Sequence, residues 1–567
     1  MNLITDAWIP VRRKSGKVER IAPWQITEDE DVITVLAAPR PDFNGALIQF
    51  LIGLLQTTCA PKNPHEWRKW FQKPPGSKEL QEAFEPIAYA FELDGDGPRF
   101  MQETDLKNSK KAKIQPITYL LIDAPTDNTI KDNIDLFVKR TSQTKTDDGV
   151  IFCLPCVAAA LFTIQTFAPS GGGGGGGKFT SLRGGGPLST IVVENTLWKT
   201  LWLNVMEMSY FYSNKNYPIE HTFPWLQPGK FIRSKKGRAI TSEEMDPLHV
   251  YWGMPRRVFF DIKYGEIEKQ CFVCGCMTNK YSGNYKDLTM GISYFVGSGK
   301  NKKPSWVYPL HPLSPYFIDK DGTPAAIHPQ SGGIGYRHWL GLVQSDKGNK
   351  GKRKPASVIE HFILERRRDL RMWAFGYDMD NMKARCWYDS TMPLFFINDN
   401  FQEEYENRIS CMVKASKWVC GALLLGCLRA SYFEPTVNKS NNVLWKVPKT
   451  WKKFGKKTEE DIEGLTIKEK KALLEQIRSS FWQSTEGDFF ECLSKLRDAL
   501  NRGDDVVPIL EGWHKCLSSR GETIFNDVSQ IGAFDAANPK RIALAWRDLK
   551  KSIYGKKLRE LLGIPAT

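Results

Sequence analysis

The chain has 567 residues, of which 41% are hydrophobic and 12% aromatic; this composition excludes a largely disordered protein and leaves room for more than one domain. Lys and Arg outnumber Asp and Glu by 79 to 64, a net charge of +15, which is typical of proteins that meet polyanions. The N-terminus lacks the apolar core of a signal peptide, and the apolar stretches 46–55 and 418–428 are too short to cross a bilayer, so we expect a cytoplasmic protein.

The first 130 residues are predicted to mix short strands with helices. Strand-like residues at 8–11 lead to a turn at Gly16, which predicts a hairpin. A helix is predicted over 44–57, and the aromatic side chains around Trp67 indicate a second helix with a buried aromatic face. The following segment, 105–145, is polar and rich in lysine. Such a segment is most often a solvated loop, although its Lys-Arg pair at 139–140 could also enter a nucleic-acid groove.

Two Cys-x-x-Cys pairs lie far apart in the chain. Cys153 and Cys156 form the first pair, and Cys271 and Cys274, followed by Gly275, form the second. Four thiolates are the donor set of a tetrahedral structural zinc ion, and they leave no open position for a catalytic water. Redox-active or unligated cysteines would show the same spacing, but no thioredoxin-like strand–helix context surrounds these pairs. The sequence therefore predicts a structural zinc ion that joins two distant segments.

A run of seven glycines follows the first pair. Its residues are Gly171, Gly172, Gly173, Gly174, Gly175, Gly176 and Gly177, and Lys178 comes next. Glycine loses more backbone freedom on ordering than any other residue, so we expect the run to order against a surface that bare backbone can approach, such as a nucleic-acid groove. Lys178 and Arg183 would supply the positive charge. Composition alone favours a flexible linker, whereas the apolar flanks favour binding.

The remainder of the chain changes from mixed structure to helix. Residues 188–295 are predicted to be mainly β, with strands at 190–193, 201–203 and 258–262. Gly376 and the acidic residues after it predict a turn with Asn381 and Met382 near its tip, where an amide beside a flexible apolar side chain could wedge between base pairs. Alternatively, Asp380 could cap a helix. Helices are predicted over 401–432, 459–484, 489–500 and 541–562.

These patterns predict an α+β fold, with a mixed α/β domain over 1–398 and a helical bundle over 399–567. Catalytic signatures are missing from the sequence. The glycine run and Lys178 resemble a phosphate-binding loop, but Phe179 occupies the position of the Ser or Thr hydroxyl that would bind magnesium. We therefore expect a binding protein rather than an enzyme. A zinc-stabilised nucleic-acid-modifying enzyme with a glycine-rich phosphate loop, or a scaffold that only binds RNA, are the alternatives.

Several motifs, modest individually, occur in an order that resembles the large subunit of the type I-E CRISPR surveillance complex Cascade, the CasA family. They are the start at 1–11, the Phe-Met-Gln step at 100–102, the first cysteine pair with the glycine run and the Leu-Arg-Gly-Gly sequence at 182–185, the second pair with Tyr-Ser-Gly at 281–283, His-Pro-Leu-Ser-Pro at 311–315, and 376–385. The resemblance covers essentially the whole chain.

The resemblance implies a non-enzymatic subunit with an α/β N-terminal domain and a C-terminal four-helix bundle. Such subunits recognise the protospacer-adjacent motif, or PAM, in double-stranded DNA, wedge the duplex open to start R-loop formation, and help recruit the effector helicase-nuclease in antiviral defence. The implied partners are CRISPR RNA, target DNA, the helicase-nuclease and the other Cascade subunits (backbone, small and guide 5′-end subunits), with no membrane. The implied DNA-binding residues are the glycine run with Lys178, a motif-reading loop at Phe137, Lys139 and Arg140, a lysine at Lys286, and a wedge at Asn381 and Met382.

Overall fold

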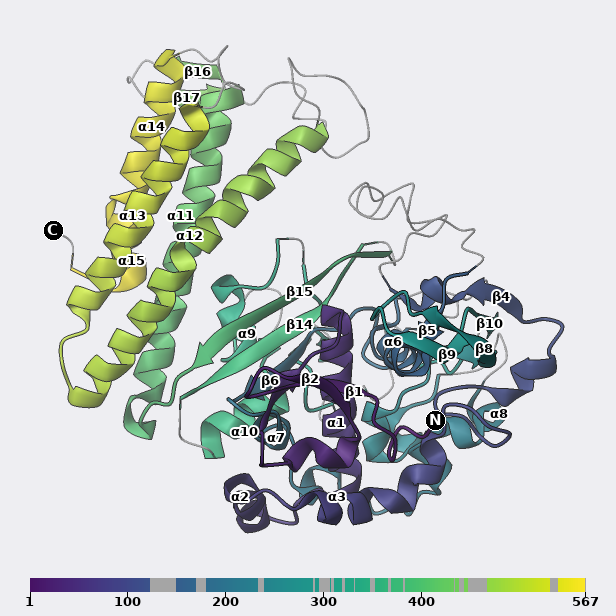
Figure 1. Ribbon diagram of the computed structural model, residues 1–567. Coiled ribbons are helices and arrows are strands. Elements are labelled where there is room, and N and C mark those ends of the chain that lie inside the picture. The colour runs from purple at the N-terminus through teal and green to yellow at the C-terminus, as the bar shows by residue number, and fades with distance from the viewer. Residues whose placement is uncertain are drawn as a thin grey trace. The chain divides into compact units, whose positions relative to one another are not determined.

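The computed structural model describes residues 1–122, 149–169, 180–232, 239–288, 291–294, 306, 311–318, 322–330, 332–346, 352–365, 369–380, 383–432, 434–437, 443–446, 467–530 and 539–565. They form two compact units (Figure 1). The first unit comprises Met1–Gly333, Gly341–Arg366 and Leu370–Leu394, and the second comprises Ile334–Leu340, Arg367–Asp369 and Phe395–Thr567. The first unit mixes helices and sheets and the second is mainly helical, which confirms the predicted fold class.

The core of the first unit is built around α1 (Pro41–Thr58), a helix that is almost entirely buried. Pro41 at its first position has a backbone angle suited to helix initiation. The ring of Phe50 makes edge-to-face contacts with five other buried rings, which are those of Trp8, Phe91, Phe100, Phe162 and Trp252. Such contacts add to the free energy gained by burying aromatic area, so α1 is the packing centre of this unit.

Five small antiparallel sheets lie in the described part of the first unit. In spatial order they are β2 (Val18–Ile21), β1 (Ile9–Arg13) and β3 (Ile33–Leu36); β4 (Lys113–Pro116), β10 (Asn284–Leu288) and β7 (Arg257–Phe260); β5 (Phe152–Cys153), β9 (Met277–Ser282) and β8 (Lys263–Gln270); β15 (Lys383–Leu394), β14 (Leu370–Asp380) and β6 (Ser189–Val193); and β12 (Pro324–Ala326), β11 (Tyr316–Ile318) and β13 (Lys352–Lys354). The predicted hairpin around Gly16 is confirmed as β1–β2.

The helices of this part of the chain are mostly short. They are α2 (Pro64–Gln72), α3 (Ser77–Phe84), α6 (Leu154–Phe167), α7 (Leu197–Trp202), α8 (Pro228–Phe231), α9 (Trp339–Leu342) and α10 (Ser357–Glu365). The helices predicted at 44–57 and around Trp67 are confirmed as α1 and α2. The strand predicted at 201–203 is wrong, because Thr196 caps α7 by accepting a hydrogen bond from the backbone of Lys199. The prediction that 188–295 is mainly β is also wrong, because α7, α8 and several 3-10 helices lie there.

The β14–β15 hairpin contains the segment in which the sequence predicts a turn. Gly376 does not turn; it pairs with Tyr388 inside the ladder, which continues to the pair Asp380 and Lys383. A side chain at 376 would place its Cβ 2.7 Å from the carbonyl oxygen of Pro187, so glycine is required there by close packing. The predicted tip of the turn, Asn381 and Met382, falls between the paired residues Asp380 and Lys383. The alternative of a helix capped by Asp380 is wrong, because β15 begins at Lys383.

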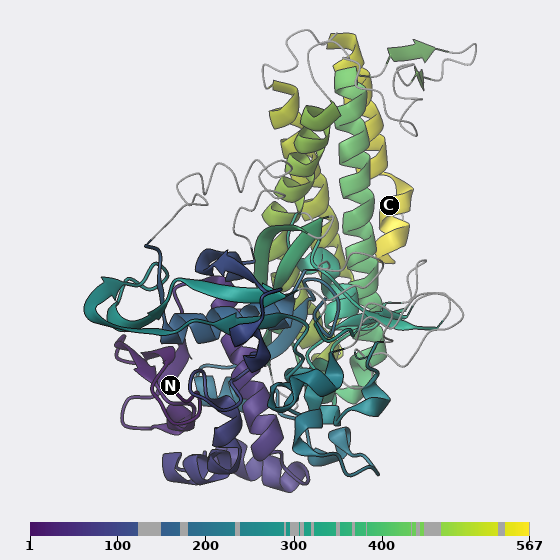
Figure 2. The same ribbon diagram turned by 90° about the vertical axis from the view of Figure 1, so that its right-hand side faces the viewer.

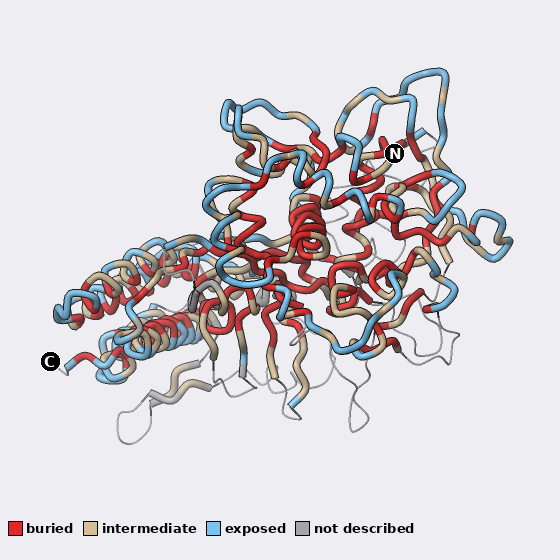
Figure 3. Tube along the Cα trace, turned by 90° about the horizontal axis from the view of Figure 1, so that it is seen from below, coloured by how far each residue is buried: buried red, intermediate tan, exposed pale blue. Residues whose placement is uncertain are grey.

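The second unit is a bundle of α11 (Gln402–Tyr432), α12 (Ile467–Arg502), α13 (Val507–Gln530) and α14 (Pro539–Ile553), with α15 (Lys556–Leu562) and the strand pair β16 (Glu434–Val437) and β17 (Val443–Lys446). Helices α11, α13 and α14 run alongside one another, and α12 packs against them over part of its length and inclines away at its N-terminal end (Figures 1 and 2). The helical part of the trace has buried residues on its inner side and exposed residues on its outer side (Figure 3). By length and composition α11 could cross a membrane, but half of its most apolar window is buried within the protein.

The sequence predicts the ends of these helices less well than their presence. The helix at 401–432 is confirmed as α11. The two helices predicted at 459–484 and 489–500 are parts of one helix, α12, which continues through Gly487. Residues 459–466 of the first prediction lie outside the described residues. The helix predicted over 541–562 divides at Gly555 into α14 and α15. Helix α13 is not among the predicted helices.

Candidate metal centre and nucleic-acid-binding segments

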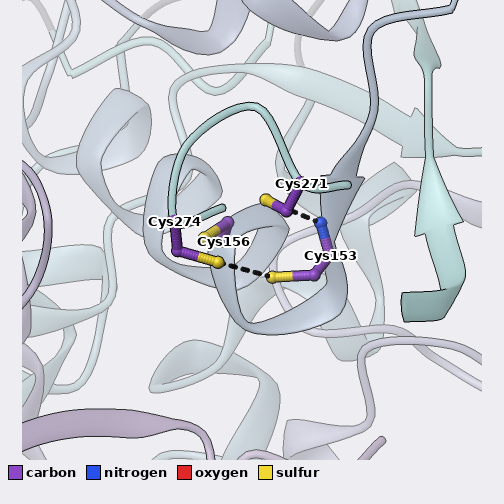
Figure 4. Close-up of side chains that lie close together, drawn as sticks. All are labelled: Cys153, Cys156, Cys271 and Cys274. Atoms are coloured by element: carbon purple, nitrogen blue, oxygen red, sulfur yellow. Dashed lines mark hydrogen bonds between the residues drawn. The ribbon is translucent and has the colours of Figure 1, made fainter. Parts of the chain in front are cut away.

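The four cysteines of the two Cys-x-x-Cys pairs lie together at one end of the β5–β9–β8 sheet (Figure 4). Cys153 is the last residue of β5 and precedes α6, whose first turn contains Cys156. Cys271 and Cys274 lie in the connection between β8 and β9. Because Cys153 pairs with Tyr281 in the β5–β9 ladder, the sheet itself brings the two distant pairs side by side.

The spacing of the sulfur atoms suits a zinc ion. All four Sγ atoms lie within 4.8 Å of one another, and those of Cys153 and Cys274 are 3.6 Å apart. Zn–S bonds of about 2.3 Å in a tetrahedron place the sulfur atoms roughly 3.8 Å apart. Cys153, Cys156 and Cys271 are buried and Cys274 is half-buried, so four cysteines could hold a metal ion with little access for water.

The backbone around the second pair makes a tight turn that supports this arrangement. Gly275 has a φ of +73°, a conformation that favours glycine. Its N–H donates to the carbonyl oxygen of Cys271 at 2.8 Å, and the N–H of Cys271 donates to that of Cys276 at 2.8 Å. From the other segment, the N–H of Cys153 donates to the sulfur of Cys271 at 3.3 Å, which favours the thiolate form that metal binding needs.

The proximity of the thiols shifts their pKa values in opposite directions. Hydrogen bonds from Cys153 and Cys156 lower the pKa of Cys271 to about 6, and hydrogen bonds from the same two residues lower the pKa of Cys274. The pKa of Cys156 is raised by its hydrogen bond with Cys153. The hydrogen bond with Cys156 acts to lower the pKa of Cys153. The hydrogen bonds with Cys271 and Cys274 outweigh it, so the pKa of Cys153 is raised too. The second pair is therefore the one whose thiolate form, the form that binds zinc, is favoured.

Two further side chains belong to this cluster. One terminal nitrogen of Arg20, Nη2, lies 3.3 Å from the Sγ of Cys274, 3.5 Å from that of Cys276 and 3.8 Å from that of Cys153. The Sγ of Cys276 is 3.3 Å from that of Cys274. The position of Cys276 two residues after Cys274 is visible in the sequence. Nothing in the sequence signals Arg20, which precedes Cys274 by 254 residues.

The glycine run and Lys178 lie outside the described residues, but both flanks of this segment are described. The N–H of Ser181 donates to the carbonyl oxygen of Ala168 at 3.3 Å, and the guanidinium of Arg256 donates to that of Pro169 at 2.7 Å. The chain therefore enters and leaves the glycine segment at one place.

Both flanks pack against the β14–β15 hairpin near its end. Before the run, the ring of Phe167 lies edge-on to those of Tyr377 and Trp387, with centroids 6.1 and 5.2 Å away. After the run, Gly186 has a φ of +62°, and a Cβ there would lie 2.7 Å from Met379 Cγ and 2.8 Å from the carbonyl oxygen of Tyr377. The flanks of the glycine segment and the end of the hairpin are thus packed as one body.

Arg183 does not supply the positive charge that the sequence suggests. Its side chain is buried, with 5% of the residue exposed, and it donates to Gln49 at 2.6 Å, Ser189 at 2.9 Å and Ser314 at 3.1 Å. Arg183 therefore fixes the segment after the glycine run to α1 and β6 rather than reaching a partner.

The other predicted binding residues are placed only in part. Phe137, Lys139 and Arg140 lie outside the described residues. So do Asn381 and Met382, which connect the paired residues Asp380 and Lys383. Lys286 lies in β10, and its ammonium group donates to the carbonyl oxygen of Lys107 at 2.5 Å.

Near the end of the β14–β15 hairpin, Arg385 and the buried carboxylate of Asp378 form a two-point ion pair, with N–O distances of 2.9 and 2.7 Å. This ion pair links the two strands just before the hairpin ends.

Comparison with known proteins gives one consistent result. Residues 2–521 match the model of the family described as CRISPR-associated protein Cse1. The fold is similar to that of Cse1 from Acidimicrobium ferrooxidans (TM-score 0.68, 14% identity, covering 99% of this chain and 98% of that one) and of Cse1 from Thermobifida fusca (TM-score 0.68, 14% identity, 100% and 99%). A chain of a "CRISPR RNA-guided surveillance complex" is also similar (TM-score 0.60, 14% identity, 98% and 99%). Because the family model spans nearly the whole sequence, the chain belongs to the CRISPR-associated protein Cse1 family.

Proposed function

We propose that this protein is the non-catalytic large subunit of a type I-E CRISPR surveillance complex, in which it recognises the PAM in double-stranded DNA. Family membership over residues 2–521 supports the assignment, as does the likeness to a chain of a surveillance complex. Its partners would be CRISPR RNA, the other subunits of the complex and target DNA, with a helicase-nuclease recruited afterwards, all in the cytoplasm. The net charge of +15 suits binding to the RNA and the DNA, which are polyanions.

The observation that carries the proposal is the packing of the glycine flanks against the β14–β15 hairpin through Phe167 and Gly186. It lets two elements with different tasks act on one stretch of duplex. Bare glycine backbone can approach the minor groove, where donor and acceptor patterns mainly distinguish A·T from G·C pairs. Only a short, degenerate motif could be read in this way, which suits a complex whose guide RNA reads the remaining sequence by base pairing.

The second task is to open the duplex beside that motif. Asn381 and Met382, at the connection between β14 and β15, would insert between base pairs. Unstacking one base-pair step costs a few kcal/mol. The ion pair of Asp378 with Arg385 would hold β14 and β15 together while the end of the hairpin inserts between the base pairs. Phosphate contacts by Lys178 and by the loop containing Phe137, Lys139 and Arg140 would offset that cost.

Binding of target DNA by the assembled complex tests this function. Complexes with wild-type subunit and with Gly173, Gly174 and Gly175 replaced by alanine are titrated with a target duplex carrying the motif and with one whose motif is scrambled. We expect the triple variant to lose affinity for the first duplex and to bind the second as the wild type does. If the wild-type complex binds the two duplexes equally, PAM recognition by this subunit is refuted.

We also propose that Cys153, Cys156, Cys271 and Cys274 hold a structural zinc ion, which would fix the start of α6 to the β8–β9 connection. Four thiolate ligands supply no catalytic chemistry, only a cross-link between segments. Metal content and Cys274→Ser test the assignment, with Cys276→Ser as a matched control two residues away. We expect one zinc ion in the wild type and the control and a loss in Cys274→Ser. A wild type purified without zinc, and unable to take it up, would refute the site.

A further inference from the structure

Arg20 has an unusual set of neighbours for an arginine on a surface strand. Within the described part of the chain, its side-chain hydrogen bonds all end on cysteine sulfur atoms, at 3.3 Å from Cys274, 3.5 Å from Cys276 and 3.8 Å from Cys153. Arg20 lies in β2, and side chains alternate between the two faces of a strand. The preceding Glu19 forms ion pairs with Arg13 and Lys17 instead.

The charge of the metal centre explains why a guanidinium would be useful there. A Zn²⁺ ion bound by four thiolates carries a net negative charge, and the site is largely buried. A buried charge is costly unless it is paired or hydrogen-bonded. The backbone N–H of Cys153 meets the sulfur of Cys271, but it carries no net charge. Arg20 brings a full positive charge and N–H donors to the sulfur atoms of Cys274, Cys276 and Cys153.

We propose that Arg20 is a positioning residue of the metal centre: it donates hydrogen bonds to the zinc-bound thiolates of Cys274 and Cys153, and Cys276 is an unligated thiol that holds the guanidinium over them. This inference rests on the proposed zinc site and adds to it a third segment of the chain. The two cysteine pairs join α6 to the β8–β9 connection. Arg20, through its contacts with Cys153 and Cys274, joins the N-terminal sheet to both segments. It lies 133 residues before Cys153 and 254 before Cys274 in the sequence.

The rate of zinc transfer to a chromogenic chelator tests the role directly. Full-length wild type, Arg20→Met, Arg20→Lys and Arg12→Met are loaded with zinc and mixed with excess chelator. Arg12 is an exposed arginine on the neighbouring strand β1, so Arg12→Met removes a similar charge without touching the cluster. Loss of a residue that orients metal ligands typically lowers metal affinity roughly 10- to 100-fold. We therefore expect Arg20→Met to release zinc roughly tenfold or more faster, with Arg20→Lys between it and the wild type and Arg12→Met unchanged.

A spectroscopic measurement separates this role from a general loosening of the fold. With Co²⁺ in place of zinc, the thiolate-to-metal charge-transfer band reports the electron density on sulfur, which a hydrogen bond to sulfur withdraws. Arg20→Met should shift that band to lower energy, and Arg12→Met should leave it in place. Wild-type release rates and an unshifted band in Arg20→Met would overturn the proposal for Arg20 while leaving the zinc site intact. A wild type that binds neither metal would overturn both.

Discussion

Gly186 links two elements that we propose to bind DNA. Its backbone has a φ of +62° and lies against Met379 and Tyr377, where a Cβ would come within 2.7 Å of a side-chain carbon. The positive φ disfavours any residue with a Cβ at position 186. The contact with β14 leaves no room for a Cβ, and β14 lies far from Gly186 in the sequence. Gly16 has a φ of +92°, but a Cβ there would meet nothing within 4 Å.

The comparison of these two glycines gives a residue-scale prediction. Gly16→Ala carries only the strain of a positive φ, about 1–2 kcal/mol. Gly186→Ala carries the same strain plus overpacking against β14, about 1–3 kcal/mol more. Urea unfolding should therefore show the greater destabilisation for Gly186→Ala. Assembled complexes with Gly186→Ala should also bind target duplex more weakly than those with Gly16→Ala. Equal effects of the two variants would show that the contact with β14 is unimportant.

A buried histidine makes the stability of the first unit depend on pH. His249 is fully buried, with Nδ1 3.3 Å from the carbonyl oxygen of Thr222 and Nε2 2.9 Å from the hydroxyl of Tyr294. Burial lowers its pKa to about 3. The folded protein therefore keeps His249 neutral at pH values where the unfolded chain, with a histidine pKa of about 6.5, takes up a proton. Its contribution to stability is complete above that value and is lost as the pH falls towards 3.

This titration predicts that the free energy of unfolding falls more steeply in the wild type than in His249→Gln as the pH is lowered. Between pH 7 and pH 5 the wild type should lose about 2 kcal/mol more of its free energy of unfolding than His249→Gln, since glutamine does not titrate. Urea unfolding at both pH values measures this loss. Other titrating groups, such as the buried His311, whose pKa is also lowered by burial, contribute equally to both proteins and cancel. Parallel pH profiles for the two proteins would contradict the assignment of a neutral His249.

Local sequence patterns predict elements whose formation depends on neighbouring residues. The β1–β2 hairpin and α1 follow from a turn glycine and from an apolar run of helical length, and both are present. The pattern fails where distant contacts decide the structure. The apolar residues of α7 fit a strand equally well in the sequence. The helix is favoured by contacts with a distant residue, because Trp198 and Trp202, whose rings stack with centroids 5.2 Å apart, both contact Trp70 of α2. The glycine at 376 lies within β14 and is required because a Cβ there would lie 2.7 Å from the carbonyl oxygen of Pro187, a residue far earlier in the sequence.

The same limit applies to the candidate sites. The four cysteines could be predicted as a cluster, because the two Cys-x-x-Cys pairs have a recognised chemistry. Arg20 could not, because an arginine in a hairpin gives no indication of partners 133 and 254 residues away. Arg183 was expected to face a partner because it follows the glycine run, whereas its hydrogen bonds to α1 and β6 place it in the core.

The metal centre gives a prediction at the scale of elements. If zinc fixes α6 to the β8–β9 connection, its removal should free that connection and the end of β5 while the packing around α1 persists. Hydrogen exchange should therefore become faster at 271–276 and 152–156 after chelation, but not within α1 or α12. Mass spectrometry of zinc-loaded and chelated protein measures this pattern. Unchanged exchange at 271–276 in protein that has lost its zinc would show that the metal does not order this connection.

At the scale of the whole molecule, we propose that DNA reading and DNA opening belong to adjacent segments that pack against each other. The glycine flanks and the β14–β15 hairpin share the contacts of Phe167 and Gly186, so a duplex held at one segment would be presented to the other. A segment that reads the motif should matter for every duplex that carries it. A segment that separates base pairs should matter only while those pairs are still closed.

The most direct test compares Met382→Ala in the assembled complex on two targets that carry the same motif. One target is fully paired, and the other has unpaired bases beside the motif. We expect a clear loss of affinity for the paired target and near wild-type affinity for the opened one, because opening beforehand removes the unstacking cost. Equal losses on the two targets would contradict the wedge, and so would wild-type affinity for both.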